Sequence, residues 1–131
     1  MAIYTNNKRV FLGGTWNNST WREKLIPLLK IDYYNPIVKD WTPECQKEEI
    51  RQRKICKYVL YVITSEMTGV YSIAEVVDDS NKRPKSTVLC VLKDGFTKSQ
   101  LKSLESVKRM VSNNGAKVCE SLEEVANYLN T

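Results

Sequence analysis

Three continuous apolar runs constrain the fold of this chain more than any other feature of its sequence. They are Val10 to Leu12, Tyr58 to Ile63 and Thr87 to Leu92. A strand with one solvated face alternates apolar and polar residues, and these runs do not alternate. Continuous apolar strands are typical of a parallel sheet covered by helices on both faces. Two weaker strands are expected at Ile31 to Tyr34 and around Ala116 to Cys119.

Helix start signals stand in the intervals between these strands. Thr42 precedes Pro43, and proline is favourable at the first helical position. Thr20, Thr97 and Ser121 each precede Glu or Gln by three residues, which is the spacing of a capping box. Apolar residues then recur at helical spacing in two helices, at Leu101, Leu104, Val107 and Met110 and at Leu122, Val125, Ala126 and Leu129. Pro27 is expected to kink or shorten the helix that begins near Thr20.

Strand and helix therefore alternate five times over 131 residues, a length that suits one domain. We expect a single α/β domain over residues 1–131 with a five-stranded, parallel, doubly wound sheet of order 2-1-3-4-5. This is a flavodoxin- or Rossmann-like arrangement with helices on both faces. Ligands bind such sheets beyond the carboxyl ends of the strands, where the strand order reverses. The loops Gly13 to Trp21 and Thr64 to Ser72 are thus the expected site.

The absence of histidine excludes several kinds of chemistry. No Ser-His-Asp triad, Cys-His dyad or His-ligated zinc is possible, so acid–base chemistry must use carboxylates, lysine, tyrosine or cysteine. The four cysteines are far apart and form no C-x-x-C pair, so we expect free thiols, no metal site and no cofactor. They are Cys45, Cys56, Cys90 and Cys119.

Charge and hydropathy set the expected partners and location. The net charge of +5 is spread without a dense basic block, which favours a solvated surface over a phosphate-bearing ligand and disfavours nucleic acid. No apolar run approaches the ~18 residues that span a bilayer, and the first nine residues show no secretion signal. We therefore expect a cytoplasmic protein without membrane contact.

The first loop carries residues that suit ligand contact. Gly13 and Gly14, followed by Thr15 and Trp16, let the backbone approach a ligand closely. Trp16 and Trp21 could offer stacking faces for a base. The alternative is that the glycines only make the turn and the tryptophans cover the core.

The second loop leads into a helix that carries a candidate nucleophile. If this helix begins near Gly69, then Ser72, Glu75 and Asp79 share one of its faces. The helix start favours negative charge, so we expect it to keep Glu75 ionised and to bind a phosphate or sugar oxygen nearby. The alternative is an ordinary glutamate that completes the helix cap.

Several stretches carry a resemblance to a known family in their order along the chain. They are Val10 to Trp16, Ser19 to Glu23, Asn35-Pro36, Asp40 to Glu44, Leu60 to Thr64 and Gly69 to Glu75. The chain resembles the nucleoside 2-deoxyribosyltransferase family, specifically its nucleoside 2-deoxyribosyltransferase-like branch. It is also similar to the related 2'-deoxynucleoside 5'-phosphate N-hydrolases. The resemblance covers about residues 10 to 92.

The resemblance implies roles for individual residues. The family's catalytic glutamate falls on Glu75, and its second acid falls on Glu49, or on Glu48 if the register slips by one. Glu49 stands where an aspartate is usual, and Lys57 stands where the family commonly has an aspartate. Besides the first loop, the expected substrate contacts are Asn35, Gly69, Tyr71, Ser72 and Asp79. The resemblance also implies a homo-oligomer.

The implied chemistry needs neither histidine nor metal. A glutamate can attack C1' of a 2'-deoxynucleoside or its 5'-monophosphate to form a glycosyl ester, while a second acid steers the sugar or protonates the leaving base. Transfer follows when another base attacks the ester, and hydrolysis follows when water does. An alternative is a non-catalytic module that binds a nucleotide or NAD derivative in the same cleft. A third is a flavodoxin-like interaction domain without a ligand.

Overall fold

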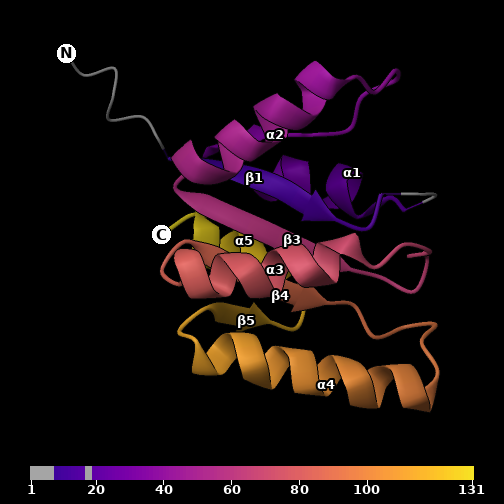
Figure 1. Cartoon of the computed structure of the whole chain (residues 1–131). Helices are drawn as coiled ribbons and strands as arrows, with labels where there is room; N and C mark the ends of the chain where they lie inside the picture. The colour runs from indigo at the N-terminus through magenta and orange to yellow at the C-terminus, as the bar shows by residue number, and fades with distance from the viewer. Residues whose placement is uncertain (1–7, 17–18) are drawn as a thin grey trace.

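The described residues form one parallel sheet with helices on both faces (Figure 1). The computed structural model describes residues 8–16 and 19–131. The strands are β1 Arg9–Gly14, β2 Asp32–Tyr34, β3 Tyr58–Ile63, β4 Thr87–Val91 and β5 Lys117–Cys119. They lie in the order β2-β1-β3-β4-β5, and every neighbouring pair is parallel. The predicted α/β doubly wound fold and its strand order are confirmed.

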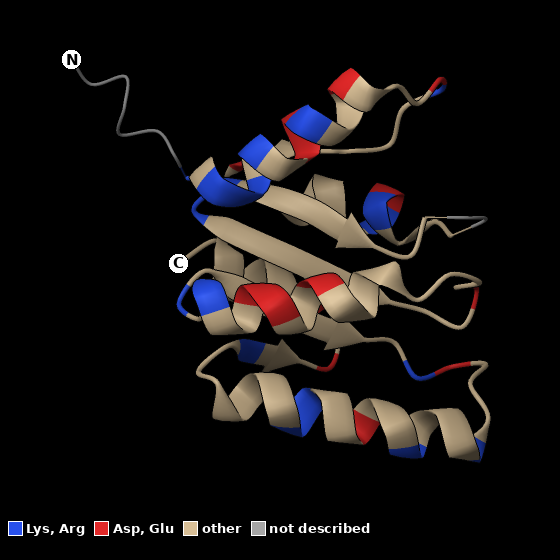
Figure 2. Cartoon of the chain, in the orientation of Figure 1, with Lys and Arg blue, Asp and Glu red and all other residues tan. Residues whose placement is uncertain are grey.

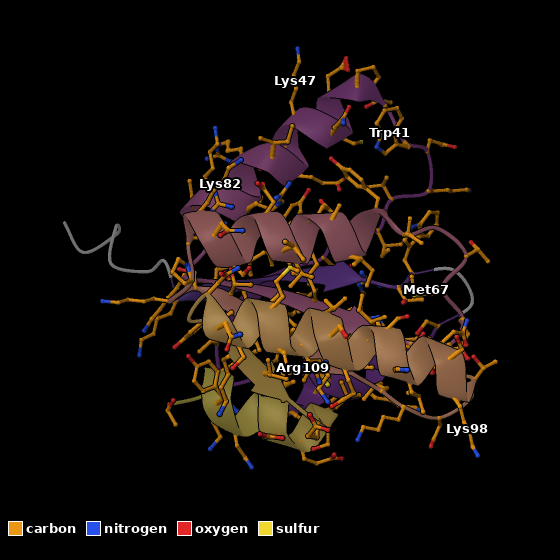
Figure 3. The ribbon with its side chains drawn as sticks, turned by 60° about the horizontal axis from the view of Figure 1, so that its bottom comes forward. Trp41, Lys47, Met67, Lys82, Lys98 and Arg109 are labelled. Carbon is orange, nitrogen blue, oxygen red and sulfur yellow. The ribbon has the colours of Figure 1, made fainter. Side chains whose placement is uncertain are left out.

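The two faces of the sheet bury different helices. The α-helices are α1 Trp21–Leu25, α2 Pro43–Ile55, α3 Tyr71–Lys82, α4 Lys98–Asn113 and α5 Leu122–Leu129, and a 3₁₀ turn, η2, spans Ile26–Leu28. Apolar residues of α1 and α5 pack with one face of β1, β3 and β4, and those of α3 and α4 pack with the other. On that second face α3 lies between α2 and α4 (Figure 3). Burial on both faces explains why the central strands carry no polar alternation.

Three of the four predicted helix caps are present. The hydroxyl of Thr42 accepts from the backbone N–H of Cys45, Thr97 forms a complete capping box, and Ser121 accepts from the N–H of Glu124. The cap predicted at Thr20 is wrong, since its side chain makes no cap hydrogen bond. The three working caps have extended backbone, with ψ near 160°, whereas Thr20 has ψ of 11° and so lacks the extended conformation typical of an N-cap.

Two further details of the helices test the sequence patterns. Pro27 lies in η2, directly after the short α1, as its predicted effect on that helix requires. Met110, predicted on the buried stripe of α4, is instead half-exposed, and Val111 is buried in its place. Two full helical turns from Leu104 end at Val111, so Met110 lies about 100° off the stripe.

In residues 8–16 and 19–131, no helix combines the length and the apolarity needed to cross a bilayer. The four cysteines are free, and three of them, Cys56, Cys90 and Cys119, are buried.

Candidate functional site

A cleft of about 400 Å³ lies at the carboxyl end of β1, between α2 and α3. Its lining comes from β1, the following loop, Arg22 of α1, the segment before α2, and helices α2 and α3: Phe11, Gly13, Gly14, Trp16, Arg22, Pro36, Ile37, Val38, Trp41, Gln46, Glu49, Ile50, Arg53, Tyr71, Ser72 and Glu75. Trp41 lies just before α2, at the same end of the molecule as Met67 in the loop after β3 (Figure 3). The cleft therefore occupies the switch point that the topology predicts.

A second hollow of about 670 Å³ lies on the other face of the sheet, beside α1 and the start of α5. It is larger, but neither Glu75 nor Glu49 lines it. The cleft between α2 and α3 combines apolar walls with converging carboxylates, one of them with a strongly displaced pKa. That combination marks a functional site better than size does.

Gly13 and Gly14, predicted to begin the first loop, are instead the last two residues of β1, and packing against β3 explains both of them. A Cβ on Gly13 would lie 2.8 Å from the ring of Tyr61, and one on Gly14 would lie 2.1 Å from the carbonyl oxygen of Val62. Gly14 also has a φ of +111°, which side chains rarely adopt. Both glycines line the cleft, but close packing against the neighbouring strand β3 is enough to require glycine at these two positions.

The two tryptophans of the first loop lie in different places. Trp16 is 64% exposed and lines the cleft. Trp21 is 2% exposed and belongs to the apolar core, and its Nε1 donates a 2.6 Å hydrogen bond to the carbonyl of Thr15. Thr15 is buried as well, where its Oγ1 accepts from the N–H of Thr64. Trp21 and Thr15 thus join the ends of β1 and β3 and do not line the cleft.

Glu75 reaches the cleft from the second turn of α3 and meets a cation from α2. An Nη1 atom of Arg53 lies 3.4 Å from Oε2 of Glu75, and the two side chains are 13% and 18% exposed. Burial raises the pKa of Glu75 to about 7, Arg53 opposes that rise, and Asp79 and Glu49 add to it. The expectation that the helix start keeps Glu75 ionised needs correction, because burial brings its pKa near neutrality in spite of that position.

Arg53 is the site residue that sequence reasoning missed. Its Nε and Nη2 donate to the two carboxylate oxygens of Asp79 at 3.2 and 3.0 Å. Asp79 is completely buried and also accepts from the hydroxyl of Tyr61 at 2.6 Å and from Arg83. Asp79 therefore lies beneath the cleft instead of lining it. The available signal was the spacing of Glu49 and Arg53, which stand four residues apart and so share one face of α2.

The structure distinguishes the two candidates for the second acid by their position. Glu49 lines the cleft opposite Glu75, and burial raises its pKa. Glu48 does not line it, because its Oε2 accepts from Arg51 at 2.8 Å and from Gln52 at 2.7 Å. Of the two, only Glu49 faces the same space as Glu75.

The remaining predicted contacts divide between cleft and surroundings. Tyr71 and Ser72 line the cleft, while Gly69 and Asn35 do not. Oδ1 of Asn35 accepts from the backbone N–H of Ile37 and so shapes the turn that leads to the cleft wall. Sequence reasoning also missed the apolar wall on the α2 side, formed by Ile37, Val38, Trp41 and Ile50.

Opposite charges face each other across the interface of α2 and α3. Figure 2 shows an acidic run on α3, and both basic and acidic residues on α2. Arg53 joins the two by ion pairs with Glu75, Asp78 and Asp79. Among the described residues, no group of three or more Cys, Asp or Glu side chains could hold a metal ion.

Comparison with known proteins adds one match. A family model described as nucleoside 2-deoxyribosyltransferase like matches residues 7–94, well over half of the chain. The matched region contains β1 to β4 and every residue that lines the cleft. Comparison with curated proteins and with solved structures gives no match.

Proposed function

Because the chain belongs to the nucleoside 2-deoxyribosyltransferase-like family, we propose that it cleaves or transfers the N-glycosidic bond of a 2'-deoxynucleoside or its 5'-monophosphate. The observation that carries this proposal is the position of Glu75. Its carboxyl group faces an apolar cleft, with a pKa of about 7 and with Glu49 lining the same space from the opposite helix.

In the proposed first step, a carboxylate oxygen of Glu75 attacks C1' of the deoxyribose. The bond from C1' to the base nitrogen breaks, and the base leaves with the electron pair and takes up a proton. The product is a deoxyribosyl ester on Glu75, as in retaining glycoside chemistry. Burial raises the pKa of Glu49, which suits a residue that supplies the proton or a hydrogen bond to the sugar. Water or a second base then attacks C1' and releases Glu75.

Aromatic side chains at the mouth of the cleft suit the base. Trp16 and Trp41 are both well exposed, and Tyr71 stands at the start of α3. An exposed indole in a cleft wall can stack on any nucleobase, because every base has a π-face. We therefore place the base near these rings and the sugar near Glu75.

The charges of the cleft favour a nucleoside over its 5'-monophosphate. Within the described lining, the cationic side chains are Arg22 and Arg53. Arg22 donates to the carbonyls of Leu12 and Thr15, and Arg53 is paired with Glu75 and Asp79. A phosphate would have to displace one of these partners, whereas an uncharged 5'-hydroxyl would not.

Assembly and location are part of the proposal. Val70 and Tyr71 expose 70% of their surface at the edge of the cleft, and large exposed apolar side chains of this kind suit contact with a second copy of the chain. The free cysteines suit a reducing compartment such as the cytoplasm.

Product analysis tests the proposed reaction. Each deoxynucleoside and each monophosphate is incubated with the protein, with and without an acceptor base, and the products are separated by chromatography. We expect turnover that Glu75→Gln lowers by about 10⁴-fold or more, since it removes the covalent route. Glu48→Gln is the matched control and should keep its activity.

Two outcomes would contradict the proposal. Wild-type turnover in the Glu75→Gln variant would remove Glu75 from the reaction. Tight binding of nucleotides without any turnover would favour the alternative, a non-catalytic module in the same cleft.

A further inference from the structure

Arg53 and Asp79 form a buried ion pair behind Glu75. The proposed reaction uses the carboxyl groups of Glu75 and Glu49 and gives this ion pair no role. We propose that Arg53, fixed by Asp79, is a positioning residue that holds Glu75 toward the cleft as a carboxylate with its oxygens free. The inference rests on the proposed function, because it assigns Arg53 a part in preparing the nucleophile.

The donors of Arg53 are unequally divided between its two main partners. Nε and Nη2 take both oxygens of Asp79 at 3.2 and 3.0 Å, a forked arrangement that fixes the plane of the guanidinium group. The Nη1 atom, on the other side of this fork, lies 3.4 Å from Glu75. That distance is longer than the 2.7–3.2 Å typical of N–H···O hydrogen bonds. Arg53 therefore attracts the charge of Glu75 without engaging its lone pairs closely.

Asp79 is itself anchored from two other directions. Tyr61 of β3 donates to one of its oxygens, and Arg83, the residue that directly follows α3, pairs with the other. Asp79 is completely buried, so it cannot turn away to solvent. Without this anchor, Arg53 would be free to form a forked pair with Glu75 and occupy the oxygens that must attack.

Within the group formed by Glu75, Asp79, Arg53 and Arg83, the charges balance when Glu75 is ionised. Arg53 and Arg83 carry two positive charges, and Asp79 and Glu75 then carry two negative ones. The charged and titratable groups around Glu75 also include Glu49 on α2, Asp78 on α3, Tyr61 on β3 and Arg22 on α1. Asp78 is half-exposed and is shared with Lys82, and Arg22 donates to backbone carbonyls. Arg53 is thus the cation that offsets the burial of Glu75.

This arrangement predicts the sign of two opposite changes. Loss of the Arg53 charge should raise the pKa of Glu75, because burial, Asp79 and Glu49 then act without opposition. Loss of the Asp79 charge should lower the pKa of Glu75, because Arg53 is then released toward it. A purely structural role for the pair would move stability but would not move the titration of Glu75 in opposite directions.

The experiment is a titration of the glutamate side-chain carboxyls of the full chain by ¹³C NMR. The Glu75 signal is assigned by its absence in Glu75→Gln. In Arg53→Met we expect the midpoint of Glu75 to rise by about 1–3 pH units, the effect of removing a neighbouring opposite charge. Arg53→Lys, which keeps the charge but not the fork, should give a smaller rise, and Asp79→Asn should give a fall. Arg51→Met is the matched control on the same helix and should leave the midpoint unchanged.

The pH dependence of kcat/KM supplies the second readout. Its acidic limb should move to higher pH in Arg53→Met, and Arg53→Lys should restore part of the shift. An unchanged or lower midpoint in Arg53→Met would overturn the inference. If Arg53→Met does not fold, a wild-type midpoint and a wild-type rate in Arg53→Lys would overturn it equally.

The two proposals fail in different ways. The carboxyl titration needs no turnover, so a protein that converts no nucleoside would overturn the proposed function whatever the titration shows. Turnover that depends on Glu75 but not on Arg53, together with an unmoved titration, would overturn the inference and leave the proposed function standing.

Discussion

Helices α2 and α5 are held in place by different forces. In α5, four of eight residues are buried in the core: Leu122, Val125, Ala126 and Leu129. In α2, which is longer, Gln52 alone is fully buried, and Ile50 remains 44% exposed. Polar contacts hold α2 instead, through Gln52 to Arg9 of β1 and through Arg53 to Asp79 of α3.

This difference shows where function sits in the fold. Apolar burial holds α5 against the sheet, so most of its side chains serve the stability of the fold. Helix α2 buries little apolar surface, and its inward-facing polar side chains Glu49 and Arg53 line the cleft. Changes in α2 should therefore alter activity more than stability, and changes in α5 should do the reverse.

The largest expected difference in turnover between two neighbouring positions is that between Glu49 and Glu48 on α2. Glu49→Gln should lower turnover by about 10²–10⁴-fold, the usual range for a lost acid–base group. Glu48→Gln should change it little, because Glu48 pairs with Arg51 and Gln52 outside the cleft. Steady-state kinetics of both variants on the same substrate measure the contrast. Equal losses in the two variants would remove Glu49 from its proposed role.

The two tryptophans of the first loop extend the contrast to a second pair. Trp21→Ala empties a core position beneath α5 and should cost about 3–5 kcal/mol of unfolding free energy. Trp16→Ala should cost less than about 1 kcal/mol, yet weaken nucleoside binding by roughly ten- to hundredfold through lost stacking. Melting curves and ligand titrations on both variants decide the matter. Unaltered affinity in Trp16→Ala would remove the main proposed base contact.

The sequence was sufficient to predict the fold, because the strands and their connections can be recognised from short stretches of sequence. The uninterrupted apolar runs at β3 and β4 could only be buried on two faces, and parallel strands with right-handed crossovers leave few orders. The same reasoning located the switch-point loops, and Glu75 and Trp16 lie in the cleft there.

The sequence was insufficient where an interaction joins distant elements. Nothing local in α2 shows that Arg53 meets Asp79, 26 residues later, under the cleft. The face shared by Ser72, Glu75 and Asp79 was also misleading, because it runs from the cleft into the buried interface with β3. Ser72 and Glu75 line the cleft, while Asp79 lies beneath it.

A direct test of the contrast between α2 and α5 compares one aliphatic residue from each of these helices. Leu129→Ala removes a fully buried side chain of α5 and should cost about 2–5 kcal/mol of unfolding free energy. Ile50→Ala in α2 should cost less than about 1 kcal/mol, since nearly half of Ile50 is already exposed. Urea unfolding of the two variants measures both values. Similar costs would show that α2 depends on apolar packing after all.

The smallest expected effect is a loss of folding stability at high pH, where the buried Glu75 must ionise. Its folded pKa of about 7 lies above the ordinary value of 4.5, so the folded protein binds this proton more tightly than the unfolded chain does. The resulting stability is complete below about pH 4.5 and is lost as the pH rises through 7. Glu75→Gln cannot ionise, so it should be more stable than the wild type at pH 8, by roughly 1–3 kcal/mol, and equal to it near pH 4. Urea unfolding at the two pH values measures the difference.

Glu48→Gln is the control, because hydrogen bonding from Gln52 lowers the pKa of Glu48 and its replacement should bring no gain at pH 8. A Glu75→Gln variant less stable than the wild type at pH 8 would mean that the ion pair with Arg53 outweighs the cost of burial, and that polar contacts hold α2 and α3 together through the cleft as well as beneath it.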